Sequence, residues 1–186
     1  MSDLNGIRIA ILATNGVEQA ELVEPRKYLE QNGARTTLIS PKAGEIQAMK
    51  HDEKADMLKV DLELSQADPE EFDAVLLPGG AMNADILRMD DDARAFVQSI
   101  DEEEKPLGVI CHAPWLLISA DLVDGRHLTS YYTIQDDLRN AGAEWDDQET
   151  IRDANWLSSR QPADIPAFNE AFAALLRESV RNRQVA

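Results

Sequence analysis

Four short runs of apolar residues recur along the chain, and segments with helical spacing lie between them. The runs cover residues 7–13, 35–40, 72–77 and 106–110. Short and nearly continuous apolar runs are typical of parallel strands that are covered by helices on both faces. The pattern therefore predicts four core strands of an α/β protein.

The helical segments have recognisable starts and stops. Residues 18–31 predict a helix that ends near Gly33, with a turn or kink at Pro25, which lacks the amide hydrogen of a regular helix. Residues 91–104 carry apolar side chains at spacings of three and four, which predicts an amphipathic surface helix. A mostly apolar helix is predicted over residues 112–122, directly behind the fourth strand.

The remaining segments complete one domain over residues 1–186. Residues 45–64 alternate weakly between apolar and charged positions, which predicts short strands or a hairpin outside the main sheet. Further predictions are a helix over 133–140, a strand within 151–159 and a closing helix over 162–181. The whole pattern predicts a flavodoxin-like, doubly wound and mostly parallel sheet, in which sites lie at the carboxyl ends of strands.

Composition narrows the possible partners and locations. The 186 residues carry a net charge of −17, which opposes binding to nucleic acid or to an anionic membrane. The apolar run 7–13 is too short to cross a membrane, and the chain is expected in the cytoplasm. A single Cys cannot form an internal disulfide, and the three His show no zinc-binding spacing, so we expect no cofactor and no metal.

Cys111 is the strongest candidate for chemistry. It lies between the predicted strand at 106–110 and the helix that starts near His112. Such a turn exposes its side chain on a tight bend, and the amides at the helix start favour the thiolate. The alternative is an inert Cys at the end of a buried strand.

Three neighbouring features could assist Cys111. Gly79 and Gly80 follow the third strand, where their bare amides are candidate oxyanion donors, although a tight turn alone would also need glycine. Glu18 follows the first strand and is a candidate proton shuttle, or else a solvated acid in a helical turn. His112 is the candidate for a His that assists the thiol, although neighbouring side chains diverge.

Motifs along nearly the whole chain resemble the ThiJ/PfpI superfamily, in particular its intracellular protease and general stress protein branch. The matching segments are residues 18–22, 72–80, 111–114, 128–131, 136–137, 140–145, 155–160 and 162–164. The resemblance implies a flavodoxin-like fold similar to class I glutamine amidotransferases, and a homodimer or larger homo-oligomer. It also implies that Cys111 is the nucleophile and that Glu18 is hydrogen-bonded to it.

The activities of that family suggest three functions. The leading hypothesis is a stress-protective enzyme of the deglycase or glutathione-independent glyoxalase type, with Cys111 attacking dicarbonyls or their protein or nucleotide adducts. The first alternative is a PfpI-type cysteine peptidase, whose acid comes from a neighbouring subunit; here that position falls at Ala84 or shifts to Asp85. The second is a non-enzymatic redox-sensing or stress-protection protein with an oxidisable Cys111.

Overall fold

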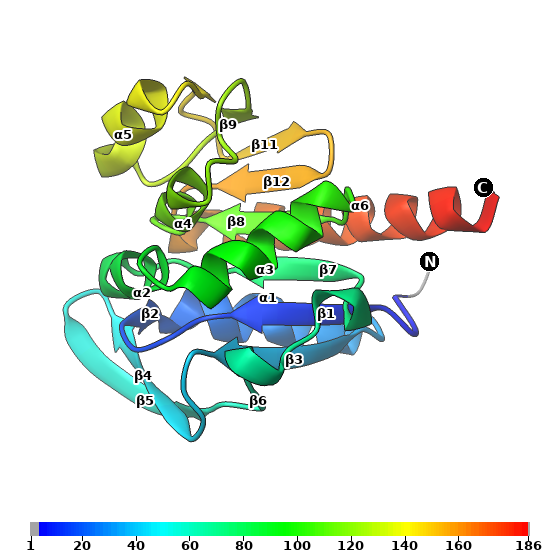
Figure 1. The fold of residues 1–186 in the computed structure, drawn as a ribbon, viewed down its shortest axis with the longest axis horizontal. Helices are drawn as coiled ribbons and strands as arrows, with labels where there is room; N and C mark the ends of the chain where they lie inside the picture. The colour runs from blue at the N-terminus through cyan, green and yellow to red at the C-terminus, as the bar shows by residue number, and fades with distance from the viewer. Residues whose placement is uncertain (1–3, 186) are drawn as a thin grey trace.

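A seven-stranded sheet forms the centre of the protein (Figure 1) in a computed structural model that describes residues 4–185, with side chains for 4–181. Its strands are β1 (Arg8–Leu12), β3 (Arg35–Ser40), β6 (Leu62–Glu63), β7 (Ala74–Leu77), β8 (Leu107–Ile110), β11 (Thr150–Asp153) and β12 (Trp156–Ser159). They lie in the order β11-β12-β8-β7-β1-β3-β6. All neighbours are parallel except β11 and β12. The predicted doubly wound sheet and its four core strands are confirmed.

Helices bury both faces of this sheet. In β1, Ile9 and Ile11 pack toward α1 (Gln19–Gln31) and α6 (Ile165–Val185), together with Phe168. Ala10 and Leu12 face the opposite layer, which contains α3 (Asp91–Glu102) and α4 (Pro114–Ser119). Alternate side chains point to opposite faces of a strand, so two buried faces require the continuous apolar runs seen in the sequence.

Helix α1 differs from the prediction at Pro25. It continues from Gln19 to Gln31 with Pro25 in its interior, so no turn interrupts it. Leu22 and Leu29 on either side of Pro25 are buried against the sheet, and this packing compensates for the missing hydrogen bond. The predicted stop is confirmed, because Gly33 has a φ of 96° directly after the helix.

The segment at 45–64 forms the predicted excursion. Strands β4 (Glu45–Lys50) and β5 (Glu53–Lys59) make an antiparallel hairpin, and β2 (Val17–Glu18) pairs with β4 in a separate three-stranded sheet. Short 3-10 turns follow at Leu64–Gln66 and Pro69–Glu71. Figure 1 places this hairpin beside the edge of the main sheet that carries β6.

Several short elements complete the fold. The helix predicted at 133–140 is a 3-10 turn at Tyr132–Ile134 followed by α5 (Gln135–Asn140), and the closing helix α6 follows a 3-10 turn at Pro162–Asp164. The elements that the pattern did not predict are β2, α2 (Ala81–Leu87), β9 (His127–Leu128) and β10 (Glu144–Trp145). The single strand predicted within 151–159 is a pair of antiparallel strands, β11 and β12. Among the described residues, no helix combines the length and apolar character needed to cross a membrane.

Candidate active site

Cys111 lies on a strained bend between β8 and α4. Its φ of 66° is in the left-handed region, which costs energy for any residue with a Cβ. Two backbone hydrogen bonds hold the bend, from the Cys111 amide to the Ser159 carbonyl at 3.1 Å and from the Tyr131 amide to the Cys111 carbonyl at 2.9 Å. The predicted sharp turn is therefore present, but Cys111 is only 6% exposed, so the expectation that this turn exposes its side chain is wrong.

The Pro78–Gly80 turn after β7 packs directly against Cys111. A Cβ added at Gly79 would lie 2.5 Å from the Cys111 Cβ, so a larger residue does not fit there. Buried Asn83 fixes this turn, because its Nδ2 donates to the carbonyls of Pro78 and Gly79, each at 3.0 Å. Its Oδ1 accepts from the Thr14 amide at the end of β1. The ends of three neighbouring strands thus meet around the thiol.

Glu21 is the carboxyl group beside the thiol. It lies in the first turn of α1, is fully buried, accepts a hydrogen bond from the Gly79 amide at 2.9 Å and interacts with the Cys111 side chain. Burial is the main cause that raises the pKa of Glu21 to about 8, and the charge of Glu18 is the second cause. Glu21 therefore keeps its proton at neutral pH.

This position corrects the expectation that Glu18 is hydrogen-bonded to Cys111. Glu18 is the residue before α1, and its Oε2 accepts from the His51 amide in the β4–β5 turn at 2.9 Å. The first helical turn begins one residue after Glu18 and carries Glu21 to the thiol instead. Glu18 acts on the site indirectly, because its charge raises the pKa of Glu21.

The thiol itself is not biased toward the thiolate. Burial, followed by the charge of Glu21, raises the pKa of Cys111 above its ordinary value, while the amides of Gly80 and His112 lower it. The sequence favoured the opposite direction because it predicted a helix over 112–122. Helix α4 begins only at Pro114, and the lowering by the two nearby amides is smaller than the increase caused by burial. The thiol needs a base to become a nucleophile.

His112 occupies the place where such a base is needed. Its Nδ1 lies 3.1 Å from the Cys111 sulfur, and its Nε2 lies 3.3 Å from the Thr133 hydroxyl. The ring stacks on Tyr131 with 4.8 Å between centroids. Partial burial lowers the pKa of His112, so the ring is neutral at pH 7 and can accept the thiol proton through Nδ1.

The glycine amides differ in what they offer an oxyanion. The Gly79 amide already donates to Glu21, so it does not fit the expected role of oxyanion donor. The amides of Gly80 and His112 instead point toward the sulfur. Gly80 has a φ of 94°, and a Cβ there would collide with the backbone at Gly16, so this amide is placed by a conformation that glycine alone adopts easily.

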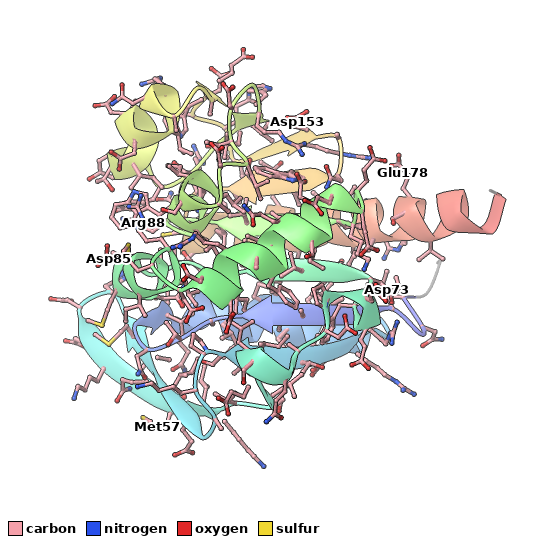
Figure 2. The ribbon with its side chains drawn as sticks, in the orientation of Figure 1. Met57, Asp73, Asp85, Arg88, Asp153 and Glu178 are labelled. Carbon is pink, nitrogen blue, oxygen red and sulfur yellow. The ribbon has the colours of Figure 1, made fainter. Side chains whose placement is uncertain are left out.

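Asp85 lies apart from this cluster. It is exposed on α2, one helical turn before Arg88, as Figure 2 shows. Within the described chain, His112 Nε2 has Thr133 as its partner. The role of Asp85 as an acid for a neighbouring subunit stays a prediction.

Sequence reasoning missed Glu21, Thr133 and Asn83. Glu21 follows Glu18 by three residues, a spacing that places both on one side of a helix, and this signal could have identified it. Thr133 is brought to His112 by the turn that follows β9, and Asn83 by the unpredicted α2. Those contacts join distant segments, and no local pattern in the chain marks them.

Comparisons with known proteins find relatives over nearly the whole chain. A sequence model of the DJ-1/PfpI family matches residues 7–175. Deglycase TK1284 of Thermococcus kodakarensis is 41% identical over 92% of this chain and 100% of its own. Protein/nucleic acid deglycase 2 of Escherichia coli is 39% identical over 91% of this chain and 97% of its own.

Solved structures show the same fold. A two-domain protein from Anabaena variabilis, with DJ-1/ThiJ/PfpI-like and ferritin-like domains, has a TM-score of 0.85 and 31% identity. The match covers 91% of this chain and 48% of that one. Drosophila melanogaster DJ-1beta has a TM-score of 0.83 and 23% identity, with 100% of both chains covered.

Proposed function

The chain belongs to the DJ-1/PfpI family, and from that premise we propose that it is a cysteine-dependent enzyme acting on reactive dicarbonyls or on their adducts with proteins or nucleotides. The observation that carries the proposal is the contact of the Cys111 thiol with both the Glu21 carboxyl and the His112 ring. Relatives that are named deglycases, at about 40% identity over nearly the whole chain, support the same substrate class.

In the proposed first step, the Cys111 sulfur attacks an aldehyde carbon of the substrate. His112 Nδ1 takes the thiol proton, and protonated Glu21 gives its proton to the carbonyl oxygen, so a hemithioacetal forms. The amides of Gly80 and His112 stabilise the oxygen while it carries charge, and each such donor is worth about 3 kcal/mol in comparable sites.

For a free dicarbonyl, the ionised Glu21 then acts as a base. Glu21 removes the hydrogen from the carbon that bears sulfur, while protonated His112 gives its proton to the adjacent carbonyl oxygen, so an enediol forms. Glu21 then returns its proton to that adjacent carbon and His112 takes the proton of the hydroxyl on the sulfur-bearing carbon, which leaves a thioester of a 2-hydroxy acid. Water hydrolyses that thioester and restores the thiol. For an adduct, the same carbon is a carbinolamine and carries no aldehyde carbonyl, so the Cys111 sulfur displaces the protein or nucleotide nitrogen from it. The C–N bond breaks as the C–S bond forms, the nitrogen leaves with the proton that His112 took from the thiol, and the same hemithioacetal results.

The experiment follows methylglyoxal loss and lactate formation by pure protein in phosphate buffer, since amine buffers consume the aldehyde. Cys111→Ser, His112→Ala and Glu21→Gln are each expected to lose about 100-fold or more in kcat/KM. Glu18→Gln is the matched control and keeps most activity. Because Glu21 must start protonated, wild-type activity declines above about pH 8, and Glu18→Gln moves this decline to lower pH.

A second assay separates the two branches of the proposal. Preformed methylglyoxal adducts of N-acetylarginine are incubated with enzyme, and their decay is compared with spontaneous dissociation. Decay faster than spontaneous release indicates action on the adduct, whereas decay at the spontaneous rate with lactate formation indicates action on the free dicarbonyl. Absence of both activities in wild type would refute the proposed function and favour a redox role for Cys111.

A peptidase is the second candidate, because the 3.1 Å contact between Cys111 and His112 is that of a nucleophile and its base. This reading needs a homo-oligomer in which an acid such as Asp85 reaches His112 of a neighbouring subunit. Hydrolysis of a fluorogenic peptide that is lost in Asp85→Asn, with methylglyoxal turnover unchanged, would support it.

A further inference from the structure

A second cluster of chemically capable side chains lies away from Cys111. It comprises His127 on β9, Glu144 on β10 and Asp146 directly after β10. One donor atom from each side chain can be chosen so that all three lie within 4.8 Å of one another. His127 Nε2 and Asp146 Oδ2 are already 2.9 Å apart. We propose that these three residues form a binding site for a divalent transition-metal ion of the zinc type.

Strand pairing fixes where the three side chains start. In the parallel β9–β10 pair, Glu144 lies opposite His127, and Trp145 lies opposite Leu128. Two backbone hydrogen bonds hold residues 144–146 at both ends. The Glu144 amide donates to the Arg126 carbonyl at 2.9 Å, and the Asp146 amide donates to the Leu128 carbonyl at 3.3 Å. The spacing of the donors is therefore a property of the fold and not of one mobile loop.

Burial of the intervening residues directs the donors outward. Leu128 and Trp145 are buried, and the Trp145 indole donates to Ser130 Oγ at 2.9 Å. Alternate residues of a strand point to opposite sides, so His127, Glu144 and Asp146 face solvent together. A metal ion can reach them without disturbing the core.

The charges of the cluster suit a cation. The two carboxylates carry a formal charge of −2, and among the side chains described here the Glu144 carboxylate has no hydrogen-bond or ion-pair partner. Tetrahedral donors about 2.1 Å from zinc lie roughly 3.4 Å apart, so rotation of these exposed side chains can close the site. Water would fill the remaining coordination position.

The donor set selects the class of ion. An imidazole nitrogen with two carboxylate oxygens suits zinc and its neighbours in the first transition series, whereas magnesium and calcium prefer oxygen donors alone. No local pattern marks this site, because Glu144 and Asp146 lie 17 and 19 positions after His127, and only the pairing of β9 with β10 brings the three residues together.

The test is calorimetric titration of Zn²⁺ into the full chain without an affinity tag. Cys111→Ser is the background, since the Cys111–His112 pair could also bind zinc. We expect one saturable site, weakened about tenfold or more by His127→Ala, by Glu144→Gln and by Asp146→Asn. His51→Ala, which removes another exposed His, is the matched control and keeps full affinity. Mg²⁺ is expected to give no comparable binding.

A second measurement distinguishes loss of metal binding from loss of folding. Co²⁺ bound in place of Zn²⁺ is expected to give a visible absorption band that disappears in His127→Ala, while the far-ultraviolet circular dichroism of the variant matches wild type. The proposal is overturned if wild type has no saturable site, if His127→Ala binds Zn²⁺ as tightly as its parent, or if His51→Ala loses the site. Mg²⁺ binding with equal affinity would also overturn it, because that result indicates a diffuse attraction to negative charge.

Discussion

Glu21 and Cys111 are two acidic groups that share one buried contact, and their effects on each other differ. The charge of Glu21 raises the pKa of Cys111, whereas the hydrogen bond from the thiol lowers the pKa of Glu21, which burial and the charge of Glu18 raise more strongly. Glu21 is fully buried, and the pKa of about 8 means that its proton stays on through neutral pH. The protein thus stores a proton donor next to its nucleophile. The same burial that makes Glu21 useful as an acid makes its ionised form unfavourable, so the stability of the folded protein depends on the protonation of Glu21.

We predict that Glu21→Gln changes how stability depends on pH. The pKa of Glu21 is raised from 4.5 to about 8 on folding, so the folded state binds more protons between these values. Wild-type stability therefore loses on the order of several kcal/mol from this group as pH rises from about 4.5 to 8. Glutamine does not ionise, so the melting temperature of the variant relative to wild type should increase across that window.

Thermal unfolding followed by circular dichroism at pH 5, 6, 7 and 8 measures this difference. Glu24→Gln removes an exposed carboxylate from the same helix and serves as the control. Parallel curves for wild type and Glu21→Gln would contradict the raised pKa. They would also remove the reason to treat Glu21 as the proton donor.

Among the secondary-structure elements, what could be predicted from the sequence depended on burial and length. The core strands were found because both faces are buried, which leaves a continuous apolar run, as in β7 and β8. Strands β9 and β10 have two residues each, too few for any periodicity to show. The extent of α4 was overestimated because apolar residues continue past Ser119 while the helix ends there.

The candidate site could also be predicted only in part. Cys111, His112 and the Gly79–Gly80 turn lie at strand ends, and the strand pattern alone brings them together. The choice between Glu18 and Glu21 depended on where α1 begins, and helix boundaries are set by contacts beyond the local sequence. The direction of the thiol pKa depended on burial, which a sequence does not display.

The turn after β7 can be tested by a substitution at Gly79. Gly79→Ala would place a methyl group 2.5 Å from the Cys111 Cβ and against the Glu21 carboxyl, so the turn must move away from the bend. We expect a loss of about 1–3 kcal/mol in the free energy of unfolding, typical of overpacking, together with loss of methylglyoxal turnover.

Gly44→Ala is the matched control for this substitution. Its φ of 102° carries a backbone cost for alanine, but an added Cβ meets no atom within 4 Å. Urea unfolding and kcat/KM of both variants should therefore separate crowding from backbone strain. Full activity in Gly79→Ala would show that the turn is not tightly coupled to the thiol.

Charge governs the behaviour of the whole molecule. Thirty-five acidic residues face eighteen Lys and Arg, which gives the net charge of −17. Several described ion pairs, such as Arg152 with Glu178 and Arg160 with Asp147, are partly exposed and contribute little each. Repulsion between the remaining carboxylates therefore dominates the long-range electrostatics and opposes the compact state. We predict that residues 1–186 form a single domain, so this repulsion should act on one cooperative unit that unfolds in one transition.

Added salt should consequently stabilise the protein. Raising NaCl from 10 to 200 mM at pH 8, with EDTA present to remove divalent ions, shortens the screening length from about 30 Å to below 10 Å. If screening lowers the repulsion between carboxylates by about 1 kcal/mol, the melting temperature rises by roughly 2–4 °C in a chain of this size. Calorimetry should show one transition that moves upward with NaCl and equally with tetramethylammonium chloride, because screening does not depend on the identity of the cation. A downward shift would mean that exposed ion pairs outweigh the repulsion, and two transitions would contradict the single domain.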